Sequence, residues 1–119
     1  MKPVIICILL MVVASSATVE AHAFLQRAEP AVGGTVQSSP GQVRIWFSEK
    51  IEPALSTIQV FDASGKEVNR RDVGLDRSNH ALLSISLQPL QPGTYKVVWR
   101  VVSVDTHVTN GSFTFRVVR

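Results

Sequence analysis

Residues 95–101 read YKVVWRV, and residues 113–118 read FTFRVV. In both stretches, apolar side chains fall on every second residue: Tyr95, Val97, Trp99 and Val101, then Phe113, Phe115 and Val117. A period of two puts these side chains on one face of a β-strand, whereas a helix needs a period near 3.6. The two stretches therefore predict two strands, each with one buried face.

The same alternation continues toward the N-terminus, in residues 43–47, 58–61 and 83–88. Turn-forming residues separate the strands: Gly33-Gly34, Ser39-Pro40-Gly41, Ser64-Gly65, Gln91-Pro92-Gly93 and Asn110-Gly111. Short strands at about ten-residue spacing are typical of antiparallel all-β domains. We expect either an immunoglobulin-like Greek-key β-sandwich or a closed barrel, with no helix beyond a turn at residues 52–55.

The N-terminal segment has the pattern of an export signal. Lys2 precedes an unbroken apolar run at residues 4–13, and small residues lead to Ala21. This pattern predicts a cleaved signal peptide at residues 1–21 and one β-domain at residues 22–119, exported to a periplasm-like or extracellular space. Cleavage after Ala21 exposes His22, but Ala23 also fits the cleavage pattern and would remove that histidine. An uncleaved N-terminal anchor is the alternative interpretation.

The composition of residues 22–119 excludes several kinds of chemistry. The single cysteine, Cys7, and both methionines, Met1 and Met11, lie within the predicted signal. The exported chain thus has no disulfide and no sulfur ligand for a metal. The net charge is +3, and the basic residues are interspersed with acidic ones. This is a mixed solvated surface, so we expect no nucleic-acid partner.

Metal chemistry would have to come from three histidines, His22, His80 and His107. His107 belongs to the sequence Asp105-Thr106-His107, just before the predicted Asn110-Gly111 turn. In an extended segment, residues two apart point to the same face. We therefore expect Asp105 and His107 to converge near one end of the sheet. Exposed loop residues without any ligand remain the alternative.

His22 would add two more nitrogen donors if cleavage made it the first residue. Its free α-amine and its imidazole can chelate one ion, and both lose their protons readily to a competing metal. With Asp105 and His107, the set would contain three nitrogens and one oxygen. Tetragonal nitrogen and oxygen ligands favour Cu(II), with Zn(II) as the main competitor.

The two ends of the chain carry a recognisable set of residues. The N-terminal part contains His22-Ala23, Leu25, Ala28, Pro30-Ala31, Gly34, Val36, Pro40, Val43, Phe47-Ser48-Glu49 and Glu52. The C-terminal part contains Pro92-Gly93-Thr94-Tyr95, Val97, Trp99-Arg100-Val101, Ser103, Asp105, His107, Gly111-Ser112-Phe113 and Phe115. In these residues the chain resembles the CopC family of periplasmic copper-resistance proteins. That family usually has glycine where this chain has Thr106. Because β-branched residues disfavour positive φ, we expect the loop to bend differently.

The resemblance implies a Greek-key sandwich that binds one Cu(II) through His22, Asp105 and His107. It also implies that Glu49 orients a ligand histidine through its other ring nitrogen, although a solvated glutamate at a strand end is equally consistent. We expect Trp46 and Trp99 to serve packing, and His80 to be exposed to solvent.

The favoured function is a monomeric, non-enzymatic protein that sequesters Cu(II) or delivers it to a CopD-type membrane transporter. One alternative is a copper oxidase resembling lytic polysaccharide monooxygenases, which also use an N-terminal histidine. The other is a metal-free immunoglobulin-like interaction module. Because the exported chain lacks sulfur ligands, we expect a single site that holds Cu(II) and not Cu(I).

Overall fold

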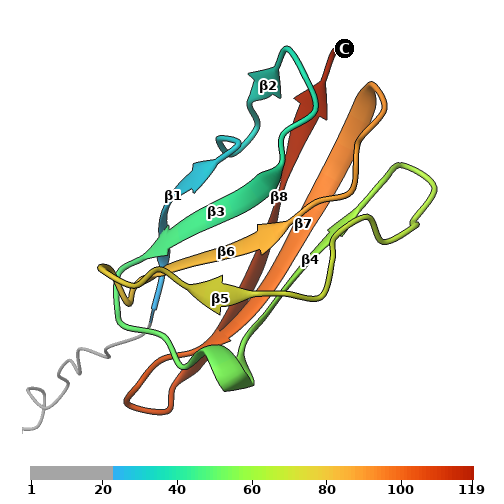
Figure 1. The fold of residues 1–119 in the computed structure, drawn as a ribbon. Helices are drawn as coiled ribbons and strands as arrows, with labels where there is room; N and C mark the ends of the chain where they lie inside the picture. Colours follow the sequence, from blue (N-terminus) through green and yellow to red (C-terminus); the bar gives the residue numbers. More distant parts are fainter. Residues whose placement is uncertain (1–22) are drawn as a thin grey trace, which may run out of the picture.

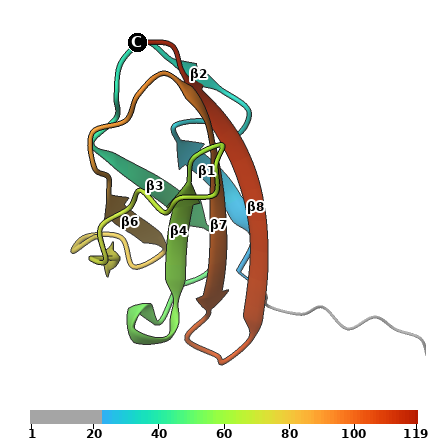
Figure 2. The ribbon, with the colours of Figure 1, turned by 90° about the vertical axis from the view of Figure 1, so that its right-hand side faces the viewer.

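A computed structural model describes residues 23–119. These residues form two four-stranded sheets packed face to face (Figures 1 and 2). In spatial order, the first sheet contains β1 (Leu25–Glu29), β3 (Gln42–Phe47), β6 (Leu82–Ser86) and β5 (Gly74–Leu75). The second contains β2 (Thr35–Val36), β8 (Val108–Val117), β7 (Gly93–Val102) and β4 (Thr57–Phe61). The predicted sandwich is confirmed, and the closed barrel is wrong.

Most neighbouring strands are not consecutive in sequence, which gives the crossed connections of Greek-key sandwiches. One pairing departs from the antiparallel prediction, because the two-residue strand β2 runs parallel to β8. The expected turn near residues 52–55 is a 3-10 helix, η2 (Pro53–Leu55). Across residues 23–119, no helix has the length and hydropathy that crossing a bilayer demands.

The core follows the alternation that the sequence showed. The inward residues of β7 and β8 are buried, and Tyr95 stacks on Phe115 with ring centroids 5.6 Å apart. Trp99 meets Phe47 of the opposite sheet edge-on at 5.2 Å, so the predicted packing role of Trp99 is confirmed. Trp46 lies on the outer face of its sheet, where the Arg27 and Arg44 guanidinium groups lie 4.2 and 4.8 Å from its ring centroid.

The predicted turn at Asn110-Gly111 is wrong. Both residues lie within β8, opposite Arg100 and Trp99 of β7. A Cβ atom on Gly111 would lie only 2.6 Å from Cζ2 of Trp99. The glycine is therefore needed because the indole of Trp99 covers it, and the chain reverses earlier, between β7 and β8 at residues 103–107.

Candidate metal centre

The connection between β7 and β8, which we call the 103–107 turn, holds both Asp105 and His107. It lies at the lower end of the sandwich in Figure 1, the same end as η2. Two backbone hydrogen bonds close it: the Ser103 N–H donates to the His107 carbonyl at 3.0 Å, and the Thr106 N–H donates to the Ser103 carbonyl at 2.8 Å. The Val104 N–H donates to the Lys50 carbonyl at 3.0 Å, which anchors the turn to the segment before η2.

Asp105 and His107 converge as predicted, but by a different geometry. Oδ1 of Asp105 lies 3.3 Å from Nδ1 of His107, and the two side chains are 44% and 47% exposed. The intervening residue, Thr106, has a φ of 72°, so the segment is not extended. The tight turn brings the carboxylate and the imidazole together, and Nε2 of His107 is the ring nitrogen not engaged by Asp105.

Ser103 acts on the same carboxylate. Its hydroxyl donates to Oδ1 of Asp105. This hydrogen bond is the largest cause that holds the pKa of the Asp105 carboxyl below its usual range, and His107 contributes in the same direction. The carboxylate therefore stays ionised well into the acidic range, as a metal ligand must.

Ala23 and Phe24, the first residues that the structure describes, lie at the same end of the sandwich as this turn. The hydroxyl of Thr109, two residues after His107, donates to the Ala23 carbonyl at 2.7 Å. The Phe24 N–H donates to Oγ of Ser48 at 2.8 Å, and the Ser48 N–H returns a bond to the Phe24 carbonyl at 2.8 Å. Ala23 and Phe24 are thereby tied to both sheets at the end that carries Asp105 and His107. His22, the remaining predicted ligand, lies outside the described residues.

Glu49 lines a shallow hollow at this end of the molecule, together with Ser48, Lys50, Ser78, Asn79, His80, Ala81 and Val104. The hollow borders the 103–107 turn through Val104, so Glu49 and one residue of this turn line the same hollow. His80 is exposed, as predicted. Within residues 23–119, side chains of His, Cys, Asp and Glu do not gather in groups of three or more that could hold a metal.

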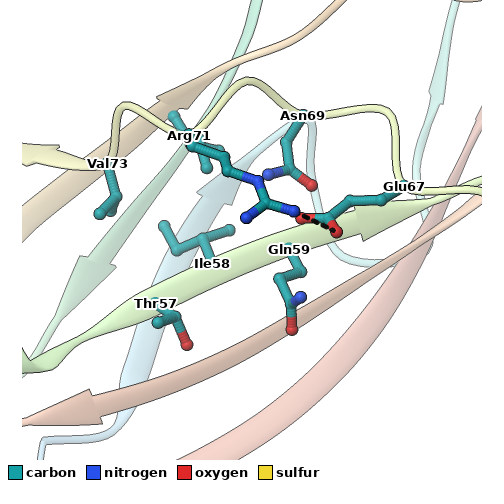
Figure 3. A pocket seen from close by; sticks show the side chains of 8 residues that line it. Thr57, Ile58, Gln59, Glu67, Asn69, Arg71 and Val73 are labelled. Atoms are coloured by element: carbon teal, nitrogen blue, oxygen red, sulfur yellow. Dashed lines mark ion pairs between the residues drawn. The ribbon is translucent and has the colours of Figure 1, made fainter.

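A separate groove of about 320 Å³ lies between β4 and the segment before β5 (Figure 3). It is lined by Thr57, Ile58, Gln59, Glu67, Asn69, Arg71, Val73 and Ile85. Glu67 and Arg71, both on the segment before β5, form an ion pair at 3.9 Å. None of the predicted ligands lines this groove, so the Asp105–His107 pair remains the candidate centre.

Comparison with known proteins agrees with this architecture. A family model described as the CopC domain matches residues 25–118. The chain belongs to the CopC family. The crystal structure of CopC from Methylosinus trichosporium OB3b is 33% identical, with a TM-score of 0.77. That match covers 82% of this chain and 94% of the other.

Two curated relatives differ greatly in length. Copper resistance protein C of Xanthomonas campestris pv. juglandis is 36% identical over 115 residues, which is 90% of each chain. Copper transport protein CutJ of Bacillus subtilis is 29% identical over 94% of this chain, but this chain spans only 21% of CutJ. CopC proteins are copper resistance proteins and not enzymes, so membership of the family gives the oxidase alternative no support.

Thr106 stands where the CopC resemblance leads us to expect glycine. The premise of the expected difference in bend, that threonine avoids a positive φ here, is wrong. The observed φ of 72° lies in the left-handed region that glycine favours. The closing hydrogen bonds of the turn hold threonine there against its own preference, at a cost of about 1–3 kcal/mol.

Replacing Thr106 by glycine should remove this strain. Glycine also gives the unfolded chain about 0.5–1 kcal/mol of extra conformational entropy, so the net gain is smaller than the strain. We expect Thr106→Gly to raise the free energy of unfolding by about 1 kcal/mol in urea denaturation. Thr106→Ala is the control, because it removes the hydroxyl but keeps the Cβ atom in the left-handed conformation. Equal stabilities of the two variants would contradict the strain.

Proposed function

We propose that this protein binds one Cu(II) ion in the periplasm, after removal of residues 1–21. The ligands are the α-amine and imidazole of His22, the carboxylate of Asp105 and the imidazole of His107. Three nitrogens and one oxygen are the donors that tetragonal Cu(II) prefers, and Cu(II) leads the divalent first-row ions in affinity. Copper is the cargo of the protein and not a catalytic group.

The observation that carries the proposal is the bond between Thr109 and the Ala23 carbonyl, at 2.7 Å. Consecutive Cα atoms are about 3.8 Å apart, and residue 22 is covalently joined to Ala23. Thr109 in turn is two residues from His107. Ala23, the residue that follows His22, is thus held by a hydrogen bond to a residue two positions from His107. This supports a site assembled from the N-terminus and the 103–107 turn.

Glu49 fits the same proposal as an orienting group. It follows Ser48, which is bonded to Phe24, and it lines the hollow beside Val104. A carboxylate in this position is suited to accept the second ring N–H of a ligand histidine. We propose that it supports the His22 imidazole.

Delivery to a CopD-type membrane transporter is the proposed destination of the copper. In CutJ, a region similar to this chain is part of a much longer protein named for copper transport. Exposed apolar side chains also occur at the end of the sandwich that carries the candidate site: Phe24, Leu55, Val104 and Val108 are each at least 45% exposed. Apolar surface of this kind suits contact with another protein.

A copper titration tests the proposal. The chain that begins at His22 should bind one equivalent of Cu(II), with the electron paramagnetic resonance spectrum of a tetragonal site, and should prefer Cu(II) to Zn(II). After reduction with ascorbate, a chromogenic Cu(I) chelator should remove the ion, because residues 22–119 contain no Met or Cys. Failure to bind Cu(II), or tight retention of Cu(I), would contradict it.

A further inference from the structure

Ser103 is nearly inaccessible to solvent, although it is polar and stands in a turn. Its exposed fraction is 1%, and it is one of three buried polar residues among those described, with Ser56 and Asn69. A buried hydroxyl without a partner would be destabilising, so the partners of Ser103 are informative. They are Asp105 and the backbone of His107, the two residues proposed as ligands.

The hydroxyl has a single proton, and the geometry shows where it goes. Oδ1 of Asp105 is its nearest acceptor, and the His107 carbonyl is 3.4 Å away. The lone pairs of the same oxygen face the His107 N–H at 3.3 Å. Ser103 therefore donates to the carboxylate and accepts from the backbone of the histidine. Its own N–H and carbonyl make the two bonds that close the turn.

These contacts constrain the side chain of Asp105. Oδ1 is engaged by both the Ser103 hydroxyl and Nδ1 of His107, which leaves Oδ2 for a metal. A carboxylate held in this way offers one oxygen, at a fixed angle to the histidine. Without the hydroxyl, the side chain could rotate and offer either oxygen or both.

We propose that Ser103 is the positioning residue of the copper site, which fixes Asp105 as a one-oxygen ligand. This inference rests on the proposed function. The interpretation to be excluded is that Ser103 only stabilises the turn. Ser103 acts through Asp105, so its effect on copper must disappear when the carboxylate is absent, whereas a general effect on the turn must persist.

The test is a double-mutant cycle in the chain that begins at His22. Ser103→Ala should lower Cu(II) affinity about 10-fold or more, as expected for the loss of an orienting neighbour, and should change the g and hyperfine values of the Cu(II) spectrum. In the Asp105→Ala background, Ser103→Ala should lower the affinity less than twofold. Ser103→Thr, which keeps the hydroxyl, should restore most of the affinity.

Ser56 supplies a matched control, because it is a buried serine at the same end of the sandwich. Its hydroxyl donates to the Glu52 carbonyl and accepts from the Val102 N–H, and it contacts neither proposed ligand. Ser56→Ala should lower stability without changing the Cu(II) spectrum. An equal loss of affinity from Ser103→Ala with and without Asp105 would overturn the inference. If Asp105→Ala itself leaves binding unchanged, the proposed function fails instead.

Discussion

Adding one residue before His22 should weaken Cu(II) binding by more than about 100-fold. The added residue converts the α-amine of His22 into a peptide nitrogen, which is no longer a ready donor, and it breaks the amine–imidazole chelate. Loss of a neighbour that merely orients a ligand already costs about 10–100-fold, so loss of a ligand should cost more. The affinity should be measured by competition with a chromogenic Cu(II) chelator.

Two further chains make this comparison decisive. A chain that begins at Phe24, the product of the alternative cleavage, should bind as weakly as the extended chain, because it lacks both donors of His22. A chain with His22→Ala as its first residue keeps the amine and should fall between these and the wild type. Equal affinity of the extended and the processed chains would rule out the N-terminal ligand. Mass spectrometry of the exported protein shows which start is natural.

Replacing His107 by alanine should also weaken Cu(II) binding by more than about 100-fold, while Asp105→Asn should weaken it by about 10–100-fold. Both side chains are close to half exposed, and asparagine can still accept the hydrogen bond of Ser103. The unfolding free energy without copper should therefore change by less than about 0.5 kcal/mol. A large loss of Cu(II) affinity with little change in the free energy of unfolding would show that these two side chains serve copper binding and not folding.

Thermal unfolding gives an independent readout of the same variants. A ligand at 100 times its Kd stabilises a protein by about 2.7 kcal/mol through mass action. Wild-type protein should show this shift on addition of Cu(II), and His107→Ala should show almost none. His80→Ala is the control, since His80 is exposed and lies outside the 103–107 turn. If Cu(II) stabilised the His107→Ala variant against thermal unfolding as much as the wild type, the copper site would have to lie elsewhere.

The sequence alone predicted the features that depend on neighbours along the chain. Alternation in residues 95–101 and 113–118 marked β7 and β8, because a strand turns each successive side chain to the opposite face. The same alternation marked β3, β4 and β6, while β1, β2 and β5 lacked it or were too short to show it. The sequence also predicted which kinds of atom could bind a metal. Asp105 and His107 stand two residues apart, and all sulfur lies within residues 1–21.

Tertiary structure decided where the chain reverses and what holds the side chains of Asp105 and His107, the proposed ligands. Asn110-Gly111 has the composition of a turn, but the indole of Trp99 needs the space that a Cβ atom on Gly111 would fill, so the pair stays in a strand. The bonds from Ser103 force Thr106 into a conformation that its side chain disfavours. The bond between Ala23 and Thr109 joins residues 86 positions apart. Local patterns carry no information on such contacts, because they form only when the two sheets have packed.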